Sequence, residues 1–401
     1  MRLPKAPDFR RPPVPRSRIL LGASLAGVLT LGTGAIVVTI GAVGPGEQDA
    51  PGASPLADSS PLAPAPDESM NAPAPDEDMV PPSPDPSDAG ESEDGEDQRD
   101  EADPDSGSGG GDERRGPVSG EFFADPNAQV RQWIADNEDD GRRQLIAERI
   151  ASRPQGVWVT DAESATTKVR DTTAAAEAAG EVPVLVSYLL PGRDCGGASS
   201  GGAPDLESYD AWMADFAAGL GGGPVVVILE PDSIALSDCL SEAQRDARFA
   251  ALDRAAETIH QANPQARVYF DGGHSNWHSP ADMASWLAAA GVLENGDGIA
   301  TNIANFRTTG LEVDYAKAVL AELGDPGLGA VIDTSRNGNG PLGDEWCDPG
   351  GRRVGQAPTT ETGDSAIDAY LWIKPPGEAD GCAATAGTFS PDLAFELAGG
   401  S

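Results

Sequence analysis

Acidic side chains follow the end of a predicted β-strand in the middle of the chain. Residues 224–236, PVVVILEPDSIAL, begin with apolar, mostly β-branched residues and continue into Glu230, Pro231 and Asp232. Such a run is typical of a parallel strand buried on both faces. Pro231 ends the strand because proline has no N–H group to donate to a sheet. Chemistry in α/β folds gathers at the carboxyl ends of strands, so Asp232 is either a catalytic carboxylate or a structural cap of the next helix.

Other predicted strands also end in acidic residues, which favours the catalytic interpretation. They are Asp194, Asp271, Asp333, and Glu378 with Asp380. On neighbouring parallel strands these carboxylates would crowd one rim of the sheet. Their mutual repulsion and desolvation would disfavour such a cluster if its members served packing alone. The sequence therefore predicts a carboxylate-rich active site.

Glycoside hydrolysis is the reaction that best fits such a site. It requires one carboxylic acid that protonates the leaving oxygen and one carboxylate that acts on water or on the anomeric carbon. Crowded acids raise one another's pKa, which keeps the proton donor protonated near neutral pH. Four tryptophans lie in or beside the strand-end segments and could stack on sugar rings: Trp158, Trp277, Trp346 and Trp372. The alternative is a divalent cation held by the aspartates, but no D-x-D-x-D-G loop is present, and we expect no metal and no cofactor.

Seven predicted strands must position these residues. Beyond about residue 121, apolar strand-like runs alternate with amphipathic helices, which indicates βαβ units and a parallel sheet. The strand ranges are 156–160, 182–190, 224–230, 267–271, 298–302, 329–333 and 369–374. Helices are expected at, for example, 206–220, 243–262, 281–290 and 313–323. Seven strands over this length predict an α/β fold with a closed, TIM-like barrel rather than an open sheet.

Charge and cysteine content narrow the class of protein further. The formal net charge of −38 argues against a nucleic-acid partner, because phosphate binding requires a basic surface. The even count of 4 cysteines suggests two disulfides in an exported protein, and three pairings are possible. We favour the sequential pairing, Cys195 with Cys239 and Cys347 with Cys382.

The N-terminal part of the chain reads as a leader and a spacer. Residues 1–18 are basic and proline-rich, and residues 19–43 contain no charge and are long enough to span a bilayer. The preceding positive charge predicts a cytoplasmic N-terminus and an exported remainder, whether 19–43 is a membrane anchor or a cleaved signal peptide. Residues 44–119 are rich in proline and acids and should form a disordered linker before a domain at 120–401.

Several long motifs resemble glycoside hydrolase family 6, the cellulases, and in particular its actinobacterial endoglucanases. They are SYLLPGRDCGGASSGGAP, VVVILEPDSIAL, RVYFDGGHSNWHSPADMASWL, GIATNIANFRTT, AVIDTSRNGNGPLGDEWCDPGGR and DAYLWIKPPGEADGC, in family order. The resemblance implies a distorted seven-stranded parallel barrel and inverting hydrolysis of β-1,4-glucan. It also implies the sequential cysteine pairing.

The resemblance assigns roles by position in these motifs. Asp232 corresponds to the general acid, Asp194 to a second acid that supports it and orders the water, and Asp380 to the candidate base. Asp271 corresponds to a pKa-tuning or structural carboxylate, and Tyr188 to a residue pressed against the distorted sugar ring. The corresponding sugar-binding residues are Trp158, Ser199, His274, Trp277, Asn305, Trp346, Lys374 and Glu378.

The mode of action follows from loop length. Tunnel-forming members of the family carry longer insertions over the cleft, whereas the segment between Cys347 and Cys382 is short. We therefore expect an open cleft and internal cleavage by a monomeric, extracellular enzyme, anchored at the cell surface or secreted. The alternatives are an exo-acting cellobiohydrolase, a hydrolase of another β-glycan such as mixed-linkage glucan, and a non-catalytic, membrane-tethered glucan-binding protein.

Overall fold

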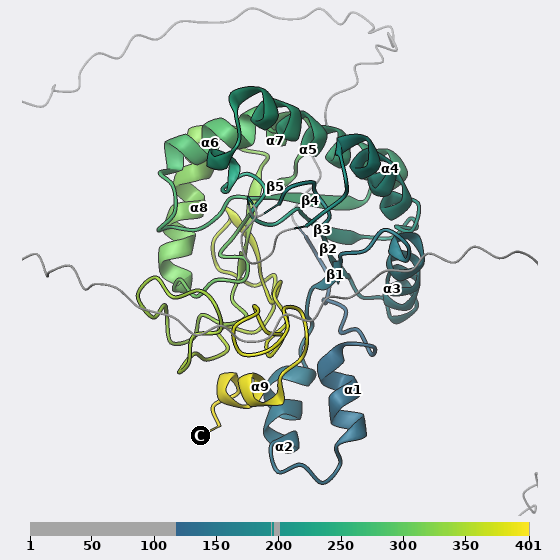
Figure 1. Ribbon diagram of the computed structural model, residues 1–401, viewed down its shortest axis with the longest axis vertical. Helices are drawn as coiled ribbons and strands as arrows, with labels where there is room; N and C mark the ends of the chain where they lie inside the picture. Colours follow the sequence, from purple (N-terminus) through teal and green to yellow (C-terminus); the bar gives the residue numbers. More distant parts are fainter. Residues whose placement is uncertain (1–117, 194, 196–200, 401) are drawn as a thin grey trace, which may run out of the picture. The chain divides into compact units, whose positions relative to one another are not determined.

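A curled parallel sheet forms the centre of the fold. The computed structural model describes residues 118–193, 195 and 201–400 of the chain. Within them, seven strands lie in one parallel sheet in the order in which they occur along the chain (Figure 1). The strands are β1 (Val157–Val159), β2 (Val184–Ser187), β3 (Val225–Leu229), β4 (Ala266–Asp271), β5 (Gly298–Thr301), β6 (Gly329–Asp333) and β7 (Ile367–Leu371).

Helices cover the outside of this sheet. Figure 1 shows α3 to α8 arranged around the strands, with α1, α2 and α9 together at one side. The helices are α1 (Gln129–Asp136), α2 (Arg143–Ile146), α3 (Ala165–Ala179), α4 (Leu206–Ala217), α5 (Glu242–Ala262), α6 (Pro280–Ala289), α7 (Val292–Asn295), α8 (Thr309–Leu323) and α9 (Pro391–Leu397). A π-helical turn, Ala147–Ala151, continues α2, and a 3₁₀ turn, Ser237–Cys239, precedes α5.

The strands β2 to β7 are buried on both faces, as their apolar runs predict, whereas Val157 and Trp158 of β1 are half-buried. In β3, Val227 and Leu229 pack with helix residues such as Phe249 of α5. Val226 and Ile228 instead join a second apolar cluster, made mostly of strand residues, which fills the concave side of the sheet. Because both faces of β3 are covered, the strand is rigid, and its carboxyl end delivers the following residues to a fixed place.

Local signals in the sequence explain where the helices begin. Ser241 and Gln244 form a reciprocal capping box at the start of α5. Asp205 accepts a hydrogen bond from the N–H of Ser208 at the start of α4, and Ser279 caps α6 with Pro280 as its first residue.

The two edge strands meet without forming a ladder. The N–H of Gly156, just before β1, donates to the carbonyl of Trp372 at 2.8 Å, and the Trp158 indole N–H donates to the carbonyl of Ile373 at 2.8 Å. Residue 156 must be glycine, because a Cβ there would lie 2.4 Å from the Ile373 carbonyl oxygen. The sheet is thus a curled α/β barrel whose edges are joined at the rim by these two hydrogen bonds.

The structure confirms the predicted order and type of the strands. The last strand lies earlier than expected, at Ile367–Leu371 instead of 369–374, because the carbonyls of Trp372 and Ile373 turn toward the β1 edge. Except for residues 118 and 119, the predicted basic tail, hydrophobic span and linker lie outside the described residues. No helix formed by the described residues combines the length and the hydropathy that a bilayer span requires.

Candidate active site

A cleft of about 1230 Å³ lies at the carboxyl ends of the strands. Ten of the residues predicted from the sequence line it: Trp158, Tyr188, Asp232, His274, Trp277, Asn305, Trp346, Lys374, Glu378 and Asp380. They come from segments that follow six different strands or, for Trp158, from β1 itself. The predicted residues Asp194 and Ser199 lie outside the described residues.

Asp232 reaches the cleft through an unusual backbone path. Both Glu230 and Asp232 adopt positive φ angles, 45° and 69°, a region that non-glycine residues rarely occupy. The intervening Pro231 contributes no N–H group to satisfy. This sharp turn at the end of β3 sends Glu230 into the core and leaves Asp232 at the cleft surface.

Asp271 lies beneath Asp232 and supports its backbone. Its side chain is 1% exposed and accepts hydrogen bonds from the N–H groups of Asp232 and, at 2.9 Å, Gly273. Burial raises the pKa of Asp271 to about 6, although these two N–H donors act in the opposite direction. Asp271 ends β4 as predicted, but it does not line the cleft.

Glu230 has a structural role that the sequence left open. Its carboxylate accepts hydrogen bonds from the N–H of Leu189, at 3.0 Å, and of Leu190, at 2.9 Å. Burial raises its pKa to about 7, against the effect of these donors and of Arg193 and Tyr209. Glu230 thus ties the end of β3 to the end of β2, directly beside Tyr188.

Aromatic side chains flank this part of the cleft. The ring of Tyr188 meets the edge of Trp158 at a centroid distance of 5.1 Å, and the guanidinium of Arg193 lies 4.0 Å from the Tyr188 ring centroid. The Trp158 indole N–H is fixed by the Ile373 carbonyl. These contacts orient both rings, as stacking against a sugar requires.

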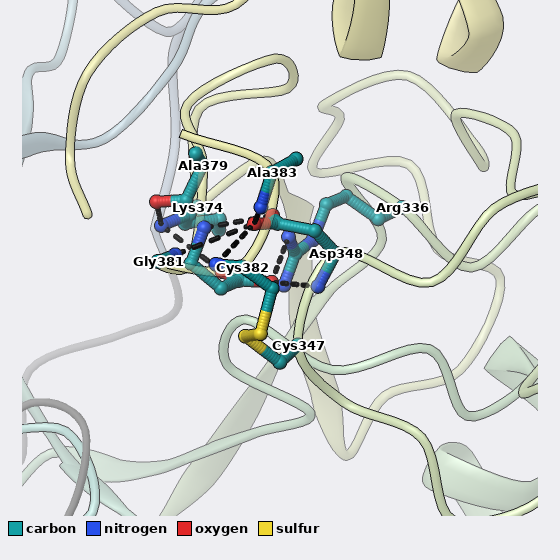
Figure 2. Close-up of a disulfide and its surroundings, with 9 residues drawn as sticks. Arg336, Cys347, Asp348, Lys374, Ala379, Gly381, Cys382 and Ala383 are labelled. Atoms are coloured by element: carbon teal, nitrogen blue, oxygen red, sulfur yellow. Dashed lines mark hydrogen bonds and ion pairs between the residues drawn. A yellow bond between two sulfur atoms is a disulfide. The ribbon is translucent and has the colours of Figure 1, made fainter. Parts of the chain in front are cut away.

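Asp380 is held by two cationic side chains on the far part of the rim. Its Oδ2 atom accepts a hydrogen bond from Nη1 of Arg336 at 2.7 Å, and its Oδ1 atom lies 3.2 Å from Nζ of Lys374 (Figure 2). The side chains of all three residues are at most 12% exposed. Such charge-assisted contacts fix the position of the carboxylate.

Glu378 and His274 carry shifted pKa values at the cleft surface. Burial raises the pKa of Glu378 to about 7, although Lys374 and a 2.7 Å hydrogen bond from Gln129 oppose this shift. Burial, together with Arg307 and His278, lowers the pKa of His274 to about 4. Near neutral pH the His274 ring is therefore uncharged. Its Nδ1 atom accepts the N–H of Asn276 at 3.2 Å, which leaves the Nε2–H group to donate to a hydroxyl group.

The raised pKa of Glu378 makes the stability of the domain depend on pH. A carboxyl group whose pKa is raised by folding makes its full contribution to stability when the pH is below its ordinary pKa, here near 4.5. This contribution is lost as the pH rises through the pKa of the folded state, here about 7. Between pH 4.5 and pH 7.5 we expect wild type to lose about 3 kcal/mol more of its unfolding free energy than the Glu378→Gln variant loses. Urea unfolding of both chains at the two pH values measures it.

Glu322→Gln on α8 is the matched control, because it removes one exposed carboxylate without touching the cleft. If Glu378→Gln and wild type lose the same unfolding free energy between the two pH values, the buried Glu378 does not cause the effect.

The structure also brings in residues that the sequence did not single out. Gln129 of α1 donates to Glu378 and accepts from the N–H of Phe389, Arg336 contacts Asp380, and Asp348 contacts the loop that follows Asp380. The motifs DTSRNG and WCDPGG contain two of them, but no local pattern shows that they meet Asp380. The described residues contain no group of His, Cys, Asp or Glu side chains arranged to hold a metal ion.

Both predicted disulfides are present. Cys195 pairs with Cys239, and Cys347 pairs with Cys382. The first links the segment after β2 to the 3₁₀ turn after β3, and the second links the β6–β7 connection to the loop after Asp380.

The chain is similar to known glycosyl hydrolases. The family model "Glycosyl hydrolases family 6" matches residues 118–394. Endoglucanase 1 of Streptomyces sp. (strain KSM-9) is 58% identical over 276 residues, which cover 68% of this chain and 77% of the relative. Endoglucanase A of Thermobispora bispora is 49% identical over 280 residues, and this chain spans only 61% of its length. The 1,4-β-D-glucan cellobiohydrolase C of Emericella nidulans is 32% identical over 240 residues, covering 50% of this chain and 53% of the relative.

A solved structure shares the fold. The endoglucanase Cel6 from Mycobacterium tuberculosis, in complex with methyl-cellobiosyl-4-deoxy-4-thio-β-D-cellobioside, is 38% identical, covers 70% of this chain and 97% of its own, and superposes with a TM-score of 0.65. Because the family model spans all seven strands and the segments that carry Asp232 and Asp380, the chain belongs to glycosyl hydrolases family 6 and is a glycoside hydrolase.

Proposed function

We propose that this chain cleaves internal β-1,4-glucosidic bonds of cellulose or a related β-glucan, with inversion at the anomeric carbon. One observation carries the proposal. Asp232, at the end of β3, and Asp380, after β7, line the same cleft together with Trp158, Trp277 and Trp346. Glycoside hydrolysis by inversion uses two carboxyl groups, one as acid and one as base, and the aromatic faces can stack on the sugar rings.

In the proposed reaction, Asp232 gives its proton to the glycosidic oxygen as the bond from this oxygen to the anomeric carbon breaks. A water molecule attacks the anomeric carbon from the opposite face of the ring. Asp380 takes the proton of this water, directly or through a second water. Asp194 is proposed as the acid that supports Asp232 and orders the water, and Tyr188 as the residue against the distorted ring.

The other cleft residues are proposed to bind the glucan. Ser199 is included with them from its motif position. Trp158, Trp277 and Trp346 offer aromatic faces, and Trp346 is 48% exposed. His274, Asn305, Lys374 and Glu378 offer polar groups for sugar hydroxyls.

Internal cleavage is supported over exo action by two observations. The relatives named endoglucanase are more similar to this chain than the cellobiohydrolase is. Cys347 and Cys382, which border the cleft loops, are separated by only 35 residues. A short connection leaves the cleft open to the middle of a polymer.

The full-length chain acting on soluble carboxymethyl cellulose tests the proposal. Internal cleavage is expected to lower the viscosity far faster than reducing ends accumulate, whereas exo action would release reducing ends with little early change in viscosity. Proton NMR of the first products of cello-oligosaccharide cleavage should show the α-anomer, because single displacement at a β-glucoside inverts the centre. An initial β-anomer would exclude the inverting reaction.

We further propose that the enzyme is exported, acts as a monomer, and is either anchored by residues 19–43 or released after cleavage near this segment. The charge pattern and apolar composition of residues 1–43 support export. N-terminal sequencing of the mature protein, combined with cell fractionation, distinguishes the anchored from the released form.

A further inference from the structure

The loop after Asp380 is organised around one carboxylate. Asp348 accepts hydrogen bonds from four successive N–H groups, those of Asp380 at 2.7 Å, Gly381 at 3.3 Å, Cys382 at 3.0 Å and Ala383 at 2.9 Å. Figure 2 shows these contacts converging on Asp348 beside the Cys347–Cys382 disulfide. Apart from a 3.3 Å contact at Gly381, each lies in the ordinary range for a hydrogen bond to a charged oxygen.

The contact between Asp348 and Asp380 is reciprocal. The N–H of Asp348 donates to Oδ2 of Asp380 at 3.1 Å, while the N–H of Asp380 donates to Oδ1 of Asp348. The same Oδ2 atom accepts from Arg336. Asp348 therefore fixes both the backbone from which the Asp380 side chain extends and one of the oxygens that this side chain presents.

The residue type at position 348 suits this role. Asp348 adopts a φ angle of 48°, where aspartate and asparagine are tolerated better than most residues. Burial acts to raise the pKa of Asp348, but the N–H groups of Ala383, Asp380 and Cys382 and the charge of Arg336 outweigh it, so the pKa is below its ordinary value. Asp348 is thus an ionised acceptor near neutral pH, and both of its oxygens are used.

The neighbouring disulfide does not replace these contacts. It joins Cys347 to Cys382 and so limits how far the two loops can separate. It supplies no acceptor for the N–H groups of residues 380–383 and does not touch the Asp380 carboxylate. The orientation of Asp380 therefore depends on Asp348, Arg336 and Lys374 together.

We propose that Asp348 is a positioning residue for the reaction, holding Asp380 at the place from which it acts on the attacking water. This inference rests on the proposed function, in which Asp380 is the base. A catalytic group must be held within about 0.5 Å of its productive position. A displacement of about 1 Å can lower the rate about 100-fold.

Asp348→Asn in the full-length chain tests the inference. Asparagine suits the positive φ angle but replaces one acceptor oxygen with a donor. Either the N–H of Asp380, bound by Oδ1, or the N–H groups of residues 381–383, bound by Oδ2, then lose their partner. We expect kcat on cello-oligosaccharides to fall about 100-fold, while KM stays within about threefold, because Trp158 and Trp277 lie on other segments. The matched control is Asp364→Asn. Asp364 also accepts hydrogen bonds from a backbone N–H, that of Ala366, and from a cationic side chain, that of Lys317. It lies before β7, at the other end of the sheet, so kcat of this variant should not change.

A double-substitution cycle separates positioning from a general structural effect. If Asp348 acts through Asp380, adding Asp348→Asn to Asp380→Asn should lower kcat no further than Asp380→Asn alone. Additive losses would overturn the inference, as would a kcat for Asp348→Asn within twofold of wild type. Asp348→Gly, which also suits the positive φ angle, repeats the test if the asparagine variant does not fold.

The same measurements keep this inference distinct from the proposed function. A wild-type chain that does not hydrolyse β-1,4-glucan would overturn the proposed function, and the inference with it. An active wild type with an active Asp380→Asn variant would overturn the role of Asp380 on which the inference depends. An active wild type, an impaired Asp380→Asn variant and an unimpaired Asp348→Asn variant would overturn the positioning role alone.

Discussion

Asp232→Ala is expected to lower kcat on β-1,4-glucan by about 100- to 10,000-fold, the usual contribution of a general acid or base. The glycosidic oxygen would then leave as an alkoxide, because its proposed proton donor is absent. KM should change little, since the aromatic faces that hold the glucan remain. The measurement is the initial rate on cello-oligosaccharides with the full-length chain.

A substrate with a good leaving group provides the decisive comparison. Dinitrophenolate leaves without protonation, so Asp232→Ala should cleave a dinitrophenyl β-cellobioside at a rate close to that of wild type. An equal loss on both substrates would contradict the assignment of Asp232 as the proton donor. Asp238→Ala is the matched control, because Asp238 is an exposed aspartate on the same segment that does not line the cleft.

The strand positions could be predicted because their signals are local. Runs such as residues 224–229 are apolar, β-branched and bounded by proline, glycine or acidic residues, and the seven-strand parallel sheet follows from their number and spacing. Because parallel strands all end at the same edge of the sheet, the candidate catalytic residues that follow them lie at one rim. Ten of the predicted site residues consequently line one cleft.

The sequence could not show which acids line the cleft and which are buried, because this depends on the backbone conformation at single residues. Glu230 and Asp232 lie two positions apart, yet the positive φ angles at the end of β3 bury the first and place the second in the cleft. Asp333 likewise ends β6 as predicted but is buried, where it accepts from the N–H groups of Ala304 and Lys374.

Contacts between distant loops were equally inaccessible to sequence reasoning. Asp348 and Asp380 are brought together by folding of the β6–β7 connection, and Gln129 reaches Glu378 from the opposite end of the domain sequence. Nothing in the spacing of these residues encodes the contact. The disulfide pairing was the exception: spacing left three pairings open, and the resemblance to family 6 implied the sequential one that the structure shows.

Asp380→Ala is expected to destabilise the domain as well as to abolish the proposed base. The side chains of Arg336 and Asp380 are only 4% and 7% exposed, so removal of the carboxylate leaves a buried guanidinium and a nearly buried ammonium without their shared partner. Breaking a buried ion pair costs about 3–5 kcal/mol. Because Lys374 and Asp380 also line the open cleft, the lower end applies, and thermal unfolding should show a melting temperature about 6 °C below that of wild type.

The double variant Arg336→Met/Asp380→Ala shows whether unpaired charge is the cause. Removing both members of a buried pair is less destabilising than removing one, because no uncompensated charge remains. Part of the lost melting temperature should therefore return, while activity stays low because the carboxylate proposed to act on water is still absent. If the double variant melts below Asp380→Ala, packing of Arg336 against Phe306, whose ring centroid lies 4.4 Å from the guanidinium carbon, outweighs the charge effect. If Asp380→Ala melts within about 1 °C of wild type, the ion pair adds nothing to stability, and the cluster of Arg336, Lys374 and Asp380 serves the reaction alone.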